Sequence, residues 1–423
     1  MDLAWVTLIA LGVVVLASCT TKLNPGVLSI ALAWIIGVYL AEPGAEPLGL
    51  RTVVGGFPTD LFLTLTGVTF LFALAQGNGT LERVAAVAVR ICRGNLGLIP
   101  VAFFTLAFVF ASVGAGNIAA TALIAPTAMA TAHRAKISSF LMMIMVGHGA
   151  NSGSMSPFAP TGVIAAGIMR DRIDVPGFEW QFFLDNFMAN AVIALVGYLV
   201  LGGWHLFKGR ASEAALLESS PIGEGSFHLK HKVTLAVLAV LLISVVVLDA
   251  NVGMAAFAGG GILILGGFSE EADAIKRMPW GVILMVSGVT VLTELLQETG
   301  GTELFTNMVA NISGPRSVTG IIAGITGVIS VYSSTSGVVL PAFLPMAAGL
   351  ADQVGASVMA VASSIIVGGH LVDTSPLSTI GALALASADP SEDRRLLFNK
   401  GLAWGLSMSV VGAVFCLLYF GMR

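Results

Sequence analysis

Charged residues are scarce in this chain. Only 10% of its 423 residues are Asp, Glu, Lys or Arg, whereas 56% are hydrophobic. A soluble domain carries about 25% charged residues, so this composition cannot cover a surface that faces water. The sequence therefore predicts a protein that crosses a membrane several times.

Cysteine and catalytic motifs are also sparse. The three cysteines, Cys19, Cys92 and Cys416, are too far apart for a disulfide framework or a zinc site. The basic residues are scattered between apolar runs, which excludes a nucleic-acid-binding face. The motif HExxH is absent and no serine-rich segment forms a known catalytic pattern, so we do not expect an intramembrane enzyme. The first eighteen residues lack a signal-peptide pattern and are expected to form a first span.

Long apolar runs occur throughout the chain. About 20 helical residues are needed to cross a bilayer, so runs of this kind predict transmembrane helices. They lie near residues 3–19, 25–41, 57–76, 183–206, 232–249, 252–268, 279–297 and 398–421. Two further spans, 138–169 and 356–388, are expected to be broken because polar residues and proline interrupt them. The predicted fold class is therefore all-α, with about ten transmembrane helices.

Two other apolar segments, 97–132 and 316–351, are interrupted at their centres by Gly-Ala-Gly-Asn and by Ser-Ser-Thr-Ser. We interpret both as re-entrant hairpins, which enter and leave the membrane on one side. With this topology only Arg51, Arg170, Arg172, Arg316 and Arg423 lie outside, and the other fifteen of the twenty Lys and Arg residues lie inside. The positive-inside rule favours this arrangement, which places both termini outside.

The two halves of the chain resemble each other at a nearly constant spacing. Thr66-Gly67-Val68-Thr69 matches Ser287-Gly288-Val289-Thr290 at an offset of 221, and Ser156-Pro157 matches Ser375-Pro376 at 219. Five crossings separate the two copies, and an odd number predicts that the second copy is inverted. Inverted repeats with broken helices are typical of secondary transporters, whose sites lie where the breaks meet.

The expected domain organisation follows from this repeat. The N-terminal repeat covers 1–207, with scaffold helices in 1–94, the hairpin 97–132, the broken helix 138–169 and the helix 183–206. A polar cytoplasmic linker, 208–231, joins it to the inverted repeat 232–423. The second repeat has scaffold helices in 232–312, the hairpin 316–351, the broken helix 356–388 and the helix 398–421. Residues 79–94 are expected to form a helix along the membrane interface, with a simple loop as the alternative.

The candidate chemistry lies at the four breaks. Asn117 at the first hairpin tip can donate to an anion or offer its oxygen to a cation, although alone it could be an ordinary helix cap. Asn151 lies in the first broken span, where small polar residues and released carbonyls suit a sodium ion. Hydroxyl groups dominate the second tip and the second broken span. No Arg or Lys is close in sequence to any break, so we expect N–H groups, hydroxyls and bound cations to hold an anion.

Ionisable residues inside a membrane are candidates for function, and they are few here. Asp373, in the second break, could ligate sodium or sense protons, or could cap a helix. Glu294 is expected to be a paired structural residue. His148 and His370 approach the breaks but are more often packing residues than ligands.

With these features the chain resembles the ion transporter superfamily, and within it the divalent anion/sodium symporters and the MatC-type malonate or dicarboxylate carriers. Hairpin tips in that family carry a Ser-Asn-Thr motif whose Asn precedes a proline by nine residues. Asn117 precedes Pro126 by nine residues, and Ser336 precedes Pro345 by nine. Both tips depart from the motif, because they read Gly116-Asn117-Ile118 and Thr335-Ser336-Gly337.

The resemblance implies a set of site residues and a mechanism. The implied sodium ligands, together with Asn151, are Ser112, Gly116, Asn117, Gly153, Ser334, Ser336, Asp373 and Thr374. The implied substrate ligands are Asn117, Ser156, Pro157, Thr335, Ser336, Thr374, Ser375 and Pro376. It also implies a homodimer in the bacterial inner membrane, surrounded by lipid, in which a transport domain moves past a scaffold domain like an elevator.

The sequence thus predicts a sodium-coupled symporter that imports a small dicarboxylate such as malonate or succinate, without an organic cofactor. A sodium/proton antiporter or another anion carrier of the same superfamily is the alternative. Proton antiport would require carboxylates at both breaks. The first break contains none, so symport is favoured over antiport. A symmetric ring of short subunits would suit an ion channel better than this internally duplicated chain does, so we do not expect a channel.

Overall fold

The computed structural model describes residues 2–21, 23–41, 46–81, 83–84, 95–170, 173, 176–209, 228–248 and 250–422. Every regular element in these ranges is helical, which confirms the expected all-α membrane fold. Seven helical stretches in the described residues are long and apolar enough to cross a membrane. They are Leu3–Thr20, Leu50–Gly77, Leu98–Arg134, Phe178–Val200, Trp280–Glu298, Thr335–Val354 and Arg394–Tyr419. Two of the seven, Leu98–Arg134 and Thr335–Val354, fall in the expected hairpins, so the topology of ten spans plus two hairpins stays a prediction.

The helices of the N-terminal half follow one another with short connections. Their bounds are α1 (Leu3–Thr20), α2 (Pro25–Tyr39), α3 (Leu50–Gly55), α4 (Thr59–Gly77), α6 (Leu98–Phe110), the π-helical turn η1 (Ala111–Ala115), α7 (Gly116–Arg134), α8 (Ser139–Ser154), α9 (Pro160–Met169), α10 (Phe178–Val200) and the 3-10 turn η2 (Gly203–Lys208). Most of the expected interfacial helix 79–94 and of the linker 208–231 lies outside the described residues.

The C-terminal half has the same order of long helices and breaks. Its elements are α12 (Leu229–Leu248), α13 (Val252–Leu265), α14 (Glu271–Arg277), α15 (Trp280–Glu298), α16 (Gly301–Ala310), α17 (Ser317–Tyr332), η3 (Thr335–Val339), α18 (Leu340–Phe343), η4 (Leu344–Met346), α19 (Ala347–Val354), α20 (Val358–Val372), α21 (Thr379–Ala386) and α22 (Arg394–Tyr419).

Corresponding helices in the two halves begin with the same capping chemistry. The side chain of Asn24 accepts from Gly26 N (2.9 Å) at the start of α2, and Asn251 accepts from Gly253 N (3.0 Å) at the start of α13. Ser138 and Ser357 cap α8 and α20 in the same way. A side-chain oxygen at this position satisfies a backbone N–H that the helix leaves free. The sequence repeat therefore has a counterpart in local structure.

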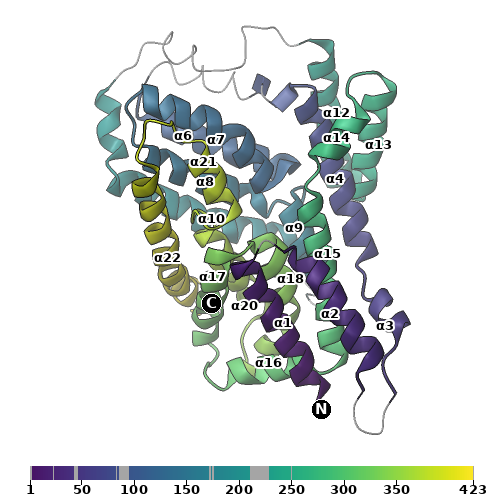
Figure 1. Cartoon of the computed structure of the whole chain (residues 1–423). Helices are drawn as coiled ribbons and strands as arrows, with labels where there is room; N and C mark the ends of the chain where they lie inside the picture. The colour runs from purple at the N-terminus through teal and green to yellow at the C-terminus, as the bar shows by residue number, and fades with distance from the viewer. Residues whose placement is uncertain are drawn as a thin grey trace.

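The helices form two groups (Figure 1). We call α1–α4 with α12–α15 the scaffold group, and α6–α10 with α17–α22 the hairpin group. Within the hairpin group, α10 contacts α20 and α7 contacts α21, so both halves of the chain build one body. Long apolar side chains such as Leu16, Val200 and Val410 are exposed on outer helices of both groups, as expected for surfaces that face lipid.

The scaffold group is held together by an exchange of partners between the halves. Helix α4 packs on α13, and its counterpart α15 packs on α2. A Cβ atom on Gly67 would lie 2.3 Å from the carbonyl oxygen of Gly253, and one on Gly288 would lie 2.2 Å from that of Gly26. Small residues let helix backbones approach this closely, and such contacts hold helices together in a membrane.

The two expected hairpin segments are both interrupted near their centres. In the first, the chain bends at Gly114, and α6 and α7 pack against each other and against α8. In the second, α17 ends at Tyr332 and extended residues precede η3. Pro126 lies inside an unbroken α7, whereas the returning part of the second segment is divided at η4, which contains Pro345. Proline removes a backbone donor and often breaks a helix in this way.

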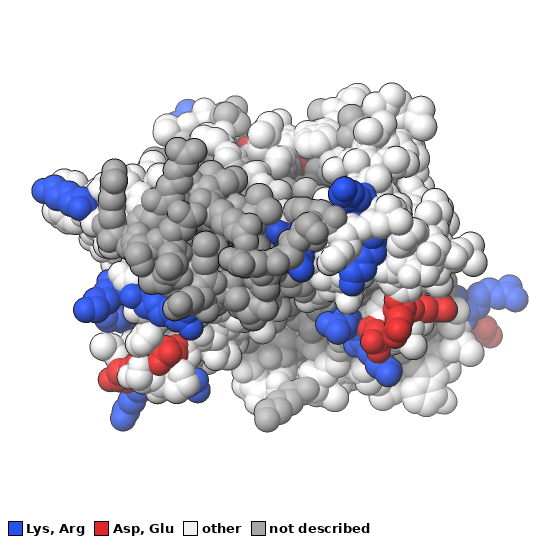
Figure 2. Space-filling view, turned by 90° about the horizontal axis from the view of Figure 1, so that it is seen from above, with Lys and Arg blue, Asp and Glu red and all other residues white. Residues whose placement is uncertain are grey.

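Lys and Arg side chains are spread over the face seen from above in Figure 2, where fewer Asp and Glu side chains are visible. The exposed basic residues of the described chain include Lys208, Lys232, Lys276 and Lys400. Such an excess on one face is what the positive-inside rule expects of a cytoplasmic surface.

We expect Gly288→Ala to destabilise the protein by about 3 kcal/mol, because the new methyl group would overlap a backbone oxygen that cannot move aside. Thermal unfolding of the purified protein in detergent measures the effect. Gly281→Ala is the control on the same helix, since its Cβ would meet only Asn24 Nδ2 at 3.9 Å. Equal melting temperatures for the two variants would contradict the close packing of α15 on α2.

Candidate functional site

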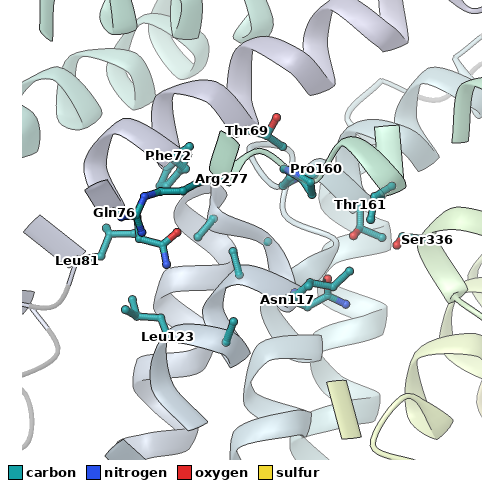
Figure 3. Close-up of a pocket in the computed structure, with 18 of the residues that line it drawn as sticks. Thr69, Phe72, Gln76, Leu81, Asn117, Leu123, Pro160, Thr161, Arg277 and Ser336 are labelled. Atoms are coloured by element: carbon teal, nitrogen blue, oxygen red, sulfur yellow. The ribbon is translucent and has the colours of Figure 1, made fainter. Parts of the chain in front are cut away.

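A cavity of about 320 Å³ lies between the two helix groups (Figure 3). One wall comes from the scaffold group, chiefly from α4 and from the junction of α14 and α15. The other wall comes from the first hairpin tip, from α9 and from the second tip. The lining polar and charged side chains are Thr69, Gln76, Asn117, Thr161, Arg277 and Ser336. Pockets for small molecules are commonly about this size or larger.

The first hairpin tip depends on glycine. Gly114 has φ of 128° and Gly116 has φ of 77°, in the region that residues with a side chain rarely adopt. A Cβ on Gly114 would also lie 2.3 Å from the ring of Phe72 in α4. Helix α7 starts at Gly116, so Asn117 lies in its first turn and on the cavity wall.

The structure brings together the residues of the first expected sodium site. Asn117 Nδ2 donates to Asn151 Oδ1 (3.0 Å), and Asn117 Oδ1 accepts from Ile118 N (3.0 Å). The hydroxyl of Ser112 lies 2.7 Å from the position that a Cβ on Gly153 would take. Asn117 is therefore tied to the broken helix α8 by its amide.

Asn151 also joins the two halves of the chain. Its Nδ2 donates to the carbonyl oxygen of His370 in α20 (2.9 Å), and its own carbonyl accepts from Asn186 Nδ2 (2.6 Å). From Asn186 the buried network continues through Asn190 to His148, whose Nδ1 lies 2.9 Å from Asn190 Oδ1. Both ring nitrogens of His148 have partners, since Nε2 accepts from Trp404 Nε1 (3.1 Å). A satisfied network of this kind fixes the orientation of its members.

Asn186 and Asn190 were not expected from the sequence. They are four residues apart on the apolar helix α10, so they share one face of it. Two amides at this spacing in an apolar membrane span are a signal that could have identified them. Asp185, beside them, is also buried and accepts from the hydroxyl of Ser363 in α20 (2.7 Å).

The second site centres on Asp373, which follows the last residue of α20. Its Oδ1 accepts from Ser330 Oγ (3.3 Å), and Ser330 Oγ lies 2.5 Å from Thr335 Oγ1. The three side chains form a buried oxygen cluster between α17, η3 and α20. The side chain of Asp373 therefore faces the hydroxyl oxygens of this cluster rather than capping a helix N-terminus. Ser330 was not expected from the sequence, because nothing in a run of apolar residues shows which hydroxyl faces a carboxylate.

Two buried polar atoms lie close in sequence to Asp373. Thr374 Oγ1 and His370 Nε2 form no hydrogen bond with any residue that the structure describes. Ser334 Oγ accepts from Gly337 N (3.1 Å) and lies 3.5 Å from Ser336 Oγ. Buried polar groups are normally satisfied, so an atom without a protein partner has room to bind water or an ion.

The expected substrate ligands do not all lie on the wall of one cavity. Asn117 and Ser336 line the cavity, but Ser156 is buried beside it and the wall there is formed by Pro160 and Thr161. Pro157 instead lines a second cavity of about 520 Å³, with Asp60, Arg170, Glu179 and Asn251.

The counterpart break is turned away from the cavity. Ser375 and Pro376 pack against Gly405 and Gly401 of α22. Thr335 lies in the cluster around Asp373, and the methyl of Thr374 faces Gly147 in α8. The direct substrate contacts expected of these residues remain predictions, and the packing of the breaks against neighbouring helices could not be inferred from their sequence.

Arg277 was not expected at the site. It is remote in sequence from all four breaks, yet it lines the same cavity as Asn117 and Ser336. It is the last residue of α14, which packs on the end of α4. Glu294, by contrast, lies on α15 beside Gly56 in the scaffold group and does not line this cavity.

The N-terminal part of the chain matches a known family model. Residues 1–154 match the model described as the N-terminus of the dicarboxylate carrier protein MatC. Two uncharacterized transporters of Mycobacterium tuberculosis, MT2759 and Rv2685, are each 25% identical over 260 residues. These matches cover 59% of this chain and 58% of the length of each relative.

Two solved structures share the fold. The crystal structure of the Alcanivorax borkumensis YdaH transporter has a TM-score of 0.58 at 18% identity, and covers 94% of this chain and 97% of that one. Neisseria gonorrhoeae MtrF has a TM-score of 0.60 at 13% identity, with 97% of both chains covered. The N-terminal part of the chain is thus similar to the MatC dicarboxylate carriers, and nearly the whole chain shares the helical membrane fold of these two solved structures.

Proposed function

We propose that this protein is a sodium-coupled symporter that imports a small dicarboxylate such as malonate or succinate. The observation that carries the proposal is the cavity between the helix groups, which has a matched position from each half of the chain, Asn117 and Ser336, on its wall. The match of residues 1–154 to the MatC carrier model supports a dicarboxylate as the substrate class.

The chemistry of the two clusters supports sodium as the coupling ion. Sodium is a hard cation that prefers oxygen ligands, and amide, hydroxyl, carbonyl and carboxylate oxygens are what Asn117, Asn151, Ser330 and Asp373 present. Ser334 and Ser336 flank Thr335 of the second cluster in sequence, and Thr374 follows Asp373 with a buried hydroxyl that has no hydrogen-bond partner among the described residues. A cation bound beside the cavity offsets the charge of a dicarboxylate, so ion and substrate bind cooperatively.

The two helix groups suit an elevator mechanism with inverted repeats. The exchange of partners, α4 on α13 and α15 on α2, is what a two-fold relation between the halves produces. Movement of the hairpin group past the scaffold group would carry Asn117 and Ser336 across the membrane while α4 stays in place. We place the protein as a homodimer in the bacterial inner membrane, with the face of Figure 2 toward the cytoplasm.

Export is a second candidate, because MtrF has a similar fold and represents a class of antimetabolite efflux pumps. Proton-coupled exchange, in which Asp373 would carry the proton, is the other alternative. An assay of substrate uptake into cells, with sodium outside and at constant pH, distinguishes sodium-coupled import from export and from proton-coupled exchange.

We expect malonate or succinate to raise the melting temperature of the purified protein in sodium and not in potassium. A ligand at a hundred times its Kd stabilises the folded state by about 2.7 kcal/mol. Thermal unfolding with each salt and each acid measures this, and acetate serves as the control with one carboxylate. Stabilisation by neither dicarboxylate in sodium would contradict the proposed function, and a response to protons alone would favour the antiporter.

A further inference from the structure

Arg277 is a charged residue on the cavity wall that the expected site does not use. It lies beside Gln76 and Phe72 at the end of the cavity remote from Ser336 (Figure 3). Its Nε lies 3.9 Å from the position that a Cβ on Gly77 would take, so its side chain lies along the end of α4. Within the described ranges no ion pair engages Arg277, whereas the neighbouring Lys276 pairs with Asp273 (4.0 Å).

The two ends of the cavity belong to different helix groups. Arg277 and Gln76 are part of the scaffold group, while Asn117, Thr161 and Ser336 are part of the hairpin group. A ligand held between the hairpin tips therefore faces Arg277 only while the groups keep the relative position seen here. When the hairpin group moves, the ligand leaves Arg277 behind.

We propose that Arg277 is a carboxylate-binding residue that acts on one side of the membrane only. It binds the carboxylate of the substrate that points away from the hairpin tips, at the stage when the cavity lies at the face of Figure 2. This role rests on the proposed function, since it takes the substrate to be a dicarboxylate carried by the hairpin group. Arg277 is then a specificity-determining residue for release and rebinding at the cytoplasmic face.

The chemistry of the guanidinium group suits this task. Its planar fork matches a carboxylate and can form two parallel hydrogen bonds, whereas a lysine ammonium offers a point charge without that geometry. Gln76, next to it on the cavity wall, provides an amide donor for the same carboxylate. Being exposed, Arg277 binds in water and is expected to contribute about tenfold in affinity, the lower end for charged hydrogen bonds.

Transport measured from both sides of the membrane tests the proposal. Right-side-out vesicles report the KM for malonate at the outer face, and inside-out vesicles report it at the cytoplasmic face. In Arg277→Gln we expect the cytoplasmic KM to rise about tenfold, while the outer KM stays within about twofold of wild type. Arg277→Lys should recover only part of the loss, because it restores charge without the fork.

Lys276→Gln is the matched control, since it removes a neighbouring exposed charge that does not line the cavity. It should leave both KM values unchanged. An equal rise of KM on both sides in Arg277→Gln, or no rise on either, would overturn the proposal. A lower maximal rate or lower abundance with both KM values unchanged would show a structural role and overturn it too. If wild-type vesicles moved neither malonate nor succinate, the proposed function itself would fail, and the role of Arg277 with it.

Discussion

Asn117→Ala is expected to reduce sodium-driven malonate uptake to the level of cells that lack the protein. The substitution removes an oxygen and an amide from the cavity wall and leaves Asn151 Oδ1 buried without its donor. An unsatisfied buried acceptor costs about 1–3 kcal/mol, in addition to the lost ligand. Uptake of radiolabelled malonate into cells, normalised to the amount of protein in the membrane, measures the effect.

Two further variants make this result specific. Ser336→Ala should abolish uptake in the same way, because Ser336 holds the matching position on the other tip. Asn311→Ala removes an exposed asparagine that follows α16 and lies outside the cavity, so its uptake should equal that of wild type. Undiminished uptake in both Asn117→Ala and Ser336→Ala would rule out the cavity as the substrate site.

Asp373→Asn is expected to raise the sodium concentration for half-maximal uptake by about tenfold or more, since it removes a charged ligand of the ion. The change keeps the size of the side chain and can still accept from Ser330, so the fold should persist. The measurement is uptake at constant malonate over a range of sodium concentrations, with choline as the replacement cation.

Asp352→Asn provides the comparison, because Asp352 is an exposed carboxylate on α19. It should leave the sodium dependence unchanged. If Asp373→Asn showed the wild-type sodium dependence, Asp373 would not be a sodium ligand. If it abolished a dependence on pH instead, the proton-coupled alternative would be favoured.

Features set by local chemistry could be predicted from the sequence. Proline, glycine and short polar residues act within a few residues of their position, so the interruptions at 111–115, 155–159 and 373–378 were foreseeable. The capping residues act over the same short range. The constant offset between the halves can be read directly from the sequence. Apolar runs of about 20 residues gave the approximate bounds of helices such as α4 and α15.

Features set by packing between distant segments could not be predicted. Ser156 and Thr161 are five residues apart on one broken helix, and only the contact with α4 decides that Thr161 lines the cavity. Arg277 reaches the cavity because α14 packs on α4, a contact that spans about two hundred residues of sequence. Asn186 and Asn190 belong to an intermediate case, since their spacing was visible but their partners on α8, Asn151 and His148, were not.

The most direct test of the transport site is an electron cryomicroscopy map of the protein prepared in sodium and malonate. We expect density for the acid in the cavity of about 320 Å³, in contact with Asn117 and Ser336, and density for a cation among the oxygens around Asp373. Malonate bound instead in the cavity lined by Asp60, Arg170 and Glu179, with none between the hairpin tips, would contradict the account.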